Sequence, residues 1–217
     1  YVNREDIEAY LKQEYIIREL KDIHEKCNLE DERVLAYCQP VFNIDYQKYD
    51  TAEALMRLNL EKIGMVYPDR FIPVAEENNY IHTLSRIILH KTCMHIKSMM
   101  DLTYIVKRIS VNFSVSEVRD KNFCNDINEI IENSGIPYEK IAIEITESQN
   151  DNDFIIMKEK IDELRRHGIK FYLDDFGTGY SNFERIMELP FDIIKFDRSL
   201  VIASDSDERS EKMVRIL

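Results

Sequence analysis

Apolar residues recur every three to four positions between residues 4 and 27, with charged residues between them. This period is typical of a helix with one buried face. Further along, apolar and polar residues alternate, which predicts strands at 34–43 and 51–58. The polar loop between them, residues 44–50, is too short to hold a crossover helix. The two strands are therefore predicted to be antiparallel neighbours.

From residue 81 onward the pattern becomes a repeated order of strand and helix. Strands are predicted at 108–114, 141–146, 169–174 and 191–196. Helices are predicted at 81–96, 123–131, 154–164 and from about residue 207 to the end. Repeated strand–helix units require a parallel sheet, which is either doubly wound or closed as a (β/α)₈ barrel.

Polar residues late in four strands decide between these two folds. They are Glu53, Asn112, Glu144 and Asp174. In an open sheet such residues would be buried under helices without partners, whereas in a barrel they converge at the C-terminal mouth. We therefore expect an α/β fold of the TIM-like barrel type.

Asp174 and Asp175 end an apolar strand and are followed by Gly177 and Gly179, which permit a sharp turn or the close approach of a ligand. Taken alone, this stretch would also suit the cap of a following helix. With Glu53, Asn112 and Glu144, however, Asp174 completes a set of hard oxygen ligands that suits Mg²⁺ or Mn²⁺. Asp175 suggests a second ion, with Asp174 bridging. Two such ions can activate a water and stabilise both oxygens of an in-line displacement at phosphorus.

The 217 residues include 44% hydrophobic and 32% charged residues, enough for one sizeable α/β domain. A formal net charge of −12 argues against a nucleic-acid polymer or direct contact with an anionic membrane, although metal ions could offset repulsion of a small anionic substrate. The chain has no C-x-x-C pair, signal peptide or long apolar segment, so reduced thiols and a cytoplasmic location are expected. The cluster of His90, Cys93 and His95 lacks the spacing of a helical zinc site, and packing roles are predicted for it.

A series of motifs resembles, in order, the bacterial EAL-domain cyclic-di-GMP phosphodiesterases. They are Gln39-Pro40, Glu53-Ala54-Leu55-Met56-Arg57, residues 64–76, Ser110-Val111-Asn112-Phe113-Ser114, Glu144-Ile145-Thr146-Glu147-Ser148, the loop that begins at Asp174, and Lys195-Phe196-Asp197-Arg198-Ser199. The resemblance covers residues 34–217. It implies a TIM-like barrel with an antiparallel first strand. It also implies hydrolysis of cyclic-di-GMP to linear pGpG with two Mg²⁺ or Mn²⁺ ions.

The resemblance also implies roles for individual residues. The metal ligands would be Glu53, Asn112, Glu144, Asp174 and, for the second ion, Asp175. The substrate-lining residues would be Gln39, Leu55, Arg57 and Asp197. Lys195 would lie beside the attacking water, and Glu147 would hold the glycine loop in its active arrangement. Two alternatives stay open: Arg57 could form a salt bridge with Glu53 or a neighbouring acid, and Glu147 could cap a helix.

Residues 1–33 are expected to form a lead-in helix from an upstream signalling domain, and residues 34–217 the EAL domain. The family's last two strand–helix units would follow Leu217, so we expect the natural chain to continue. Without those units, Lys195 is expected to face a gap, and the chain is expected to turn over poorly. A homodimer is expected, and the whole could be the cytoplasmic part of a larger, membrane-tethered protein.

Two other functions compete with the phosphodiesterase. A non-catalytic receptor for cyclic-di-GMP or a protein partner would use the same cleft. Degenerate receptors of this family usually lose metal ligands, whereas every metal-ligand position that the matched motifs include is occupied by a ligand residue here. An unrelated metal-dependent TIM-barrel isomerase or lyase is hard to reconcile with the motifs around Glu53 and Asp174.

Overall fold

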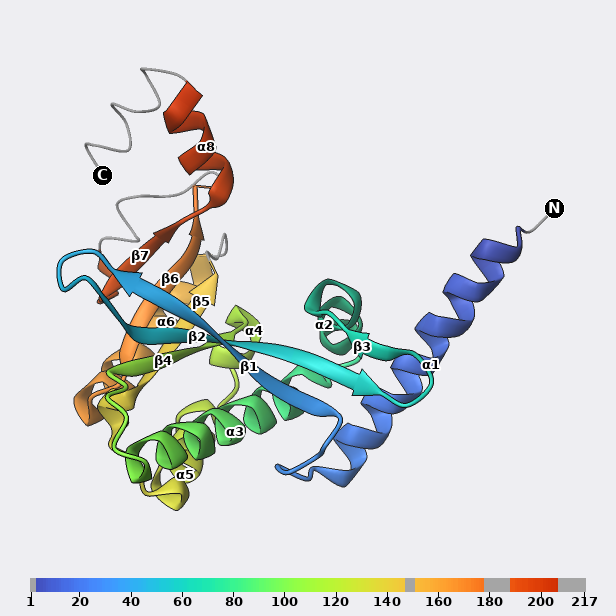
Figure 1. Ribbon diagram of the computed structural model, residues 1–217, viewed down its shortest axis with the longest axis horizontal. Helices are drawn as coiled ribbons and strands as arrows, with labels where there is room; N and C mark the ends of the chain where they lie inside the picture. The colour runs from blue at the N-terminus through green and yellow to red at the C-terminus, as the bar shows by residue number, and fades with distance from the viewer. Residues whose placement is uncertain (1–2, 147–150, 178–187, 207–217) are drawn as a thin grey trace. The chain divides into compact units, whose positions relative to one another are not determined.

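The computed structural model describes residues 3–146, 151–177 and 188–206. The described strands form one seven-stranded sheet in the order β1-β2-β4-β5-β6-β7, with β3 paired to β2 (Figure 1). This confirms the predicted α/β class. The elements are α1 (Arg4–Lys26), β1 (Val34–Asn43), β2 (Lys48–Leu60), β3 (Gly64–Val66), α2 (Pro68–Glu77), α3 (Ile81–Asp101), β4 (Arg108–Phe113), α4 (Val115–Val118), α5 (Phe123–Ser134), the 3₁₀ helix η1 (Tyr138–Lys140), β5 (Ile141–Thr146), α6 (Asp151–His167), β6 (Lys170–Phe176), β7 (Ile193–Phe196) and α8 (Arg198–Ser206).

The chain folds as two compact units, and β4 and α5 each pass from one unit to the other. Unit 1 comprises residues 1–111 and 126–137, and unit 2 comprises residues 112–125 and 138–217. In the described part of the chain, no helix combines the length and the apolar character that crossing a bilayer requires.

In unit 1, β1 and β2 are antiparallel, as predicted, and Gln39 lies opposite Glu53. Strand β2 pairs in parallel with β4, which brings Glu53 level with Ser110. Alternate residues of β2 are buried, namely Ala54, Met56, Leu58 and Leu60. The residues between them, Glu53, Leu55 and Arg57, are half-buried and share the other face, as expected from the two-residue period of a strand.

Two elements of unit 1 were not predicted. Strand β3 has only three residues, too few to give an alternating pattern. Helix α2 carries Pro73 in its interior, and a proline there reads as a helix breaker. The helix forms because Phe71, Val74 and Ala75 bury one apolar face, while Pro68 occupies the first turn, where its missing N–H is no loss.

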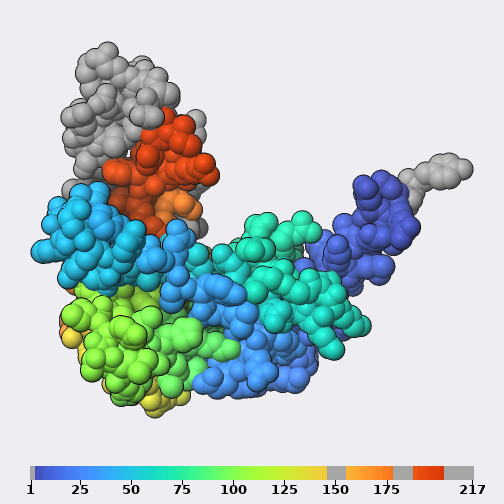
Figure 2. All heavy atoms as spheres, in the orientation of Figure 1, coloured from blue at the N-terminus to red at the C-terminus, as the bar shows by residue number. Residues whose placement is uncertain are grey.

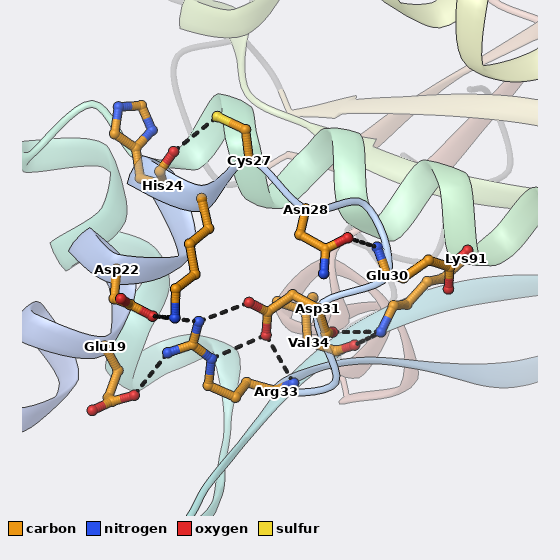
Figure 3. A network of polar contacts seen from close by, with 11 residues as sticks. Glu19, Asp22, His24, Cys27, Asn28, Glu30, Asp31, Arg33, Val34 and Lys91 are labelled. Atoms are coloured by element: carbon orange, nitrogen blue, oxygen red, sulfur yellow. Dashed lines mark hydrogen bonds and ion pairs between the residues drawn. The ribbon is translucent and has the colours of Figure 1, made fainter.

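A network of polar contacts ties the end of α1 to the start of β1 (Figure 3). The Arg33 guanidinium donates to Asp31 through Nε at 3.0 Å and Nη2 at 2.7 Å, and to Glu19 Oε2 through Nη1 at 2.9 Å. From α3, Lys91 Nζ donates to the carbonyl oxygens of Asp31 and Val34, both at 2.6 Å. The network fixes the residues that lead into β1.

In unit 2, β5, β6 and β7 are parallel neighbours. Ile143 on β5, Phe171 on β6 and Leu164 on α6 are fully buried and belong to the unit's apolar core. The β6–β7 register passes from Leu173↔Ile194 to Phe176↔Phe196, so β6 holds one extra residue between these pairs. This β-bulge lies at Asp174 and Asp175.

Helix α8 follows β7 directly. The helix predicted from about residue 207 lies outside the described residues. The start of α8 is marked by Asp197, whose carboxylate accepts a hydrogen bond from the Ser199 backbone N–H at 2.7 Å. This is the contact of a helix N-cap.

Candidate functional site

Three of the predicted site residues meet in unit 2. Glu144 on β5 is 2% exposed, and a buried carboxylate is costly unless a positive charge compensates it. Lys195 on β7 supplies that charge, because its Nζ lies 2.6 Å from Glu144 Oε2. The same Nζ lies 3.1 Å from Asp174 Oδ1 on β6. Lys195 is therefore paired with carboxylates from two other strands. The expected gap concerns a further carboxylate from the family's last two strand–helix units, and it stays a prediction.

The donor set of this cluster fits a hard divalent cation. Glu144 and Asp174 offer carboxylate oxygens that lie within 4.8 Å of each other. Such oxygens are the ligands that Mg²⁺ and Mn²⁺ prefer. Two carboxylates against one ammonium leave one net negative charge in a place where Glu144 is screened from water. A divalent ion would compensate this charge, and the free-energy cost of burying an uncompensated carboxylate would be avoided.

The bulge gives the loop after β6 an unusual backbone. Asp175 is exposed and has φ 54°, in the left-handed region that non-glycine residues rarely adopt. Gly177 follows with φ 104°, and a Cβ added there would lie 3.0 Å from Leu200 Cδ2 on α8. Backbone strain of this kind collects at functional sites, where the surrounding structure holds it in place. Helix α8 therefore lies close against this loop.

The other predicted metal ligands lie on β2 and β4. Asn112 is exposed at the end of β4, two residues after Ser110 and thus on the same side of the strand. Glu53 is half-buried in unit 1, opposite Gln39 and level with Ser110. The ligand roles of Glu53, Asn112 and Asp175 stay predictions.

Arg57 is held by contacts within unit 1. Its guanidinium lies 5.0 Å from the centre of the Tyr67 ring, and Nη1 donates to the Met56 carbonyl at 2.7 Å. Stacking on an aromatic ring presents a planar, permanently charged group with little loss of side-chain freedom. Leu55, also assigned to the substrate, is half-buried on the same face of β2.

Asp197 has a structural contact that sequence analysis missed. Hydrogen bonds from the Ser199 hydroxyl and backbone N–H keep the pKa of its carboxyl below the usual value. An aspartate two residues before a serine at the end of a strand is a signal that could have identified this cap. The substrate role of Asp197 stays a prediction. Glu147, predicted to hold the glycine loop, lies outside the described residues.

Comparisons with known proteins agree with these features. The sequence model of the EAL domain matches residues 21–217. The signaling protein YkoW of Bacillus subtilis is 28% identical over 211 residues, which cover 97% of this chain and 25% of YkoW. The probable cyclic di-GMP phosphodiesterase PdeD of Escherichia coli is 32% identical over 185 residues, which cover 83% of this chain and 33% of PdeD.

Two solved structures have the same fold. The PaMucR phosphodiesterase in its c-di-GMP complex aligns with a TM-score of 0.79 at 23% identity, covering 90% of this chain and 79% of that one. The FimX EAL domain of Xanthomonas citri in complex with c-di-GMP gives 0.79 at 20% identity, with 94% and 79% covered. The chain spans about a quarter of the length of the first curated relatives.

Proposed function

Because this chain belongs to the EAL domain family, we propose that it is a metal-dependent phosphodiesterase that hydrolyses cyclic-di-GMP to linear pGpG. The observation that carries the proposal is the cluster of Glu144, Asp174 and Lys195 beside a strained, glycine-containing loop. It unites hard oxygen ligands with a cation that can hold a water, and metal-assisted hydrolysis of a phosphodiester can use both.

Glu53, Asn112, Glu144 and Asp174 would hold one Mg²⁺ or Mn²⁺ ion, and Asp175 would contribute to a second. The bound ions would supply a more acidic water and would offset the charge on the phosphate oxygens. The contributions of the protein itself are orientation and charge. Lys195, which pairs with the two carboxylates, would orient a water, while Arg57 would donate charge-assisted hydrogen bonds to a phosphate oxygen.

Gln39 and Leu55 would line the substrate together with Asp197, and Glu147 would support the glycine loop from outside the metal shell. Removing a residue that supports a metal site in this way typically lowers activity by roughly 10- to 100-fold. Since the first curated relatives are about four times longer, we also propose that the domain works as one part of a larger signalling protein. Residues 1–33 would connect it to an upstream module, and residues 34–217 would form the phosphodiesterase domain.

The test is incubation of the chain with cyclic-di-GMP in Mg²⁺, Mn²⁺ or EDTA, with pGpG measured by chromatography. We expect slow formation of product in either metal and none in EDTA. Glu144→Gln and Asp174→Asn should each lower the rate by at least about 100-fold, because each removes a charged ligand. The matched control is Glu159→Gln on the exposed side of α6, which should keep the wild-type rate.

Two outcomes would contradict the proposal. Binding of the dinucleotide without product in either metal would favour the non-catalytic receptor. Equal rates in Glu144→Gln and in wild type would place the chemistry at other residues.

A further inference from the structure

The first half of α1 has no covering element within unit 1. Its second half buries Ile16, Leu20 and Ile23, whereas residues 3–14 are all exposed. This first half extends clear of the other elements of unit 1 (Figures 1 and 2). Two residues of this exposed half, Ile7 and Leu11, are apolar, and they are 48% and 59% exposed. A solitary helical segment is marginal in water, and apolar residues on it indicate a binding surface.

Six residues on one face of α1 have the spacing of a paired helix. Steps of four and three residues alternate along them, as in the seam of a coiled coil. They are Arg4, Glu8, Leu11, Tyr15, Arg18 and Asp22. If a second α1 runs antiparallel about Gln13, Leu11 meets Tyr15, Glu8 meets Arg18, and Arg4 meets Asp22. Every charged pair then joins opposite charges, whereas a parallel pair in register would join like charges.

The groove beside this face has the charge that the partner needs. Two cations lie close to the Tyr15 ring, with the Arg18 guanidinium 5.0 Å and Lys62 Nζ 5.5 Å from the ring centre. The adjoining groove, about 680 Å³ in volume, is also lined by Lys12 and Lys21, and Glu14 is its one acidic residue. In a chain of net charge −12, this is a local excess of positive charge. Glu8, near the start of α1 and on the same face, is acidic and complementary to it.

We propose that two copies of this chain associate through antiparallel pairing of their α1 helices. Leu11 and Tyr15 form the apolar centre, and Glu8 of each copy pairs with Arg18 of the other. The same surface serves both copies, as in other two-fold dimers. One pair of helices buries less area than a standard interface, so the dimer is weak, with a Kd on the order of 10 µM. This inference does not depend on the proposed phosphodiesterase activity.

The test is a charge exchange followed by sedimentation velocity of the 217-residue chain between about 2 and 200 µM, a range that brackets this Kd. Glu8→Lys and Arg18→Glu, made separately, should each raise the Kd by about tenfold, because each replaces two attractive pairs with two repulsive ones. The double variant should restore association to within about threefold of wild type. Residues 8 and 18 lie about 15 Å apart along one helix, so the rescue must come from contact between copies.

Asp6→Lys is the matched control. Asp6 is exposed and carries the same charge as Glu8, but it lies about 200° around the helix from it. Its Kd should stay within about twofold of wild type. Circular dichroism of each variant verifies that the helix content is unchanged. A chain that stays monomeric over the whole range would overturn the proposal. A dimer whose Kd is the same in wild type, Glu8→Lys and Arg18→Glu would also overturn it, because the two copies would then associate through a different face.

Discussion

Lys195 illustrates how one side chain can stabilise a site before any ligand arrives. Glu144 is buried, and removing its carboxylate from water without a counter-charge would cost several kcal/mol. The ammonium of Lys195 provides that counter-charge and also contacts Asp174. The lysine therefore competes with a metal ion for the same oxygens. At the same time, it keeps two like charges close together.

This competition leads to a prediction about metal affinity. Lys195→Met should raise the affinity for Mn²⁺ by roughly three- to tenfold, because one positive charge within 4 Å of the ligands is removed. Free Mn²⁺, measured by electron paramagnetic resonance during titration, reports the change. The proposed role of Lys195 beside the water requires that pGpG formation falls in the same variant.

Lys170→Met serves as the control, because Lys170 pairs with Asp192 at 2.8 Å and belongs to a different ion pair of unit 2. It should leave the Mn²⁺ affinity as in wild type. If Lys195→Met binds Mn²⁺ more weakly than wild type, the lysine supports the ligands instead of competing for them.

The contact between the β6 loop and α8 gives a prediction at the scale of elements. Gly177→Ala should lower the free energy of unfolding by about 2–4 kcal/mol, through backbone strain at φ 104° and the contact with Leu200. Urea denaturation measures the change. Gly135→Ala, at φ 69° with nothing within 4 Å, carries only the backbone strain and should cost about 1–2 kcal/mol. Equal losses in the two variants would mean that Leu200 moves aside without cost.

The junction of α1 and β1 depends on Arg33. Burial raises the pKa of the Asp31 carboxyl, but hydrogen bonds from Arg33 outweigh this effect and hold the pKa below its ordinary value. A lowered folded pKa contributes stability above the unfolded value of about 3.9, and that stability is lost as the pH falls through the folded pKa. In Arg33→Met the hydrogen bonds of the guanidinium are lost, and only the backbone N–H of residue 33 and the charge of Lys91 still oppose burial, so the pKa of Asp31 should rise.

We therefore expect Arg33→Met to cost about 2 kcal/mol at pH 7, because Asp31 is left buried without its main partner. The difference from wild type should narrow as the pH falls below the ordinary aspartate pKa of about 3.9, and it should vanish only below the lowered folded pKa of the wild type, where Asp31 is protonated in both proteins. Urea unfolding at several pH values tests this. Arg166→Met, at an exposed position of α6, should stay close to wild type throughout. A difference that does not change with pH would remove Asp31 from the explanation.

The sequence was informative where a regular period coincided with chemistry. Alternation in β2 and β5 predicted the faces that carry Glu53 and Glu144, and the short loop after β1 predicted its antiparallel pairing. It failed where tertiary packing overrides local preference, as in α2, whose interior contains Pro73. The pairing of Lys195 with Glu144 depends on which strands are neighbours, and no local pattern encodes that.

At the scale of the whole molecule, net charge sets the conditions for binding. The chain carries 41 acidic and 29 basic residues, and cyclic-di-GMP is itself an anion. In EDTA, repulsion should therefore oppose binding, and added salt should weaken that repulsion because it screens charges over about 8–10 Å. A divalent ion at Glu144 and Asp174 should tighten binding of cyclic-di-GMP far more than salt does, because it would lie directly between the protein's carboxylates and the dinucleotide's phosphates.

Calcium separates binding from turnover. Ca²⁺ has the same charge as Mg²⁺ and takes oxygen ligands, but it is larger and accepts irregular geometry. We expect it to restore cyclic-di-GMP binding in equilibrium dialysis while supporting less than about a tenth of the Mg²⁺ rate of pGpG formation, because in-line displacement depends on a fixed arrangement of oxygens.

Asp174→Asn should reduce the response of binding to all three ions, Mg²⁺, Mn²⁺ and Ca²⁺. Binding as tight in EDTA as in Mg²⁺ would show that the protein's own cations, Arg57 among them, hold the dinucleotide. Turnover in Ca²⁺ equal to that in Mg²⁺ would show that charge compensation alone, and not ligand geometry, limits the reaction.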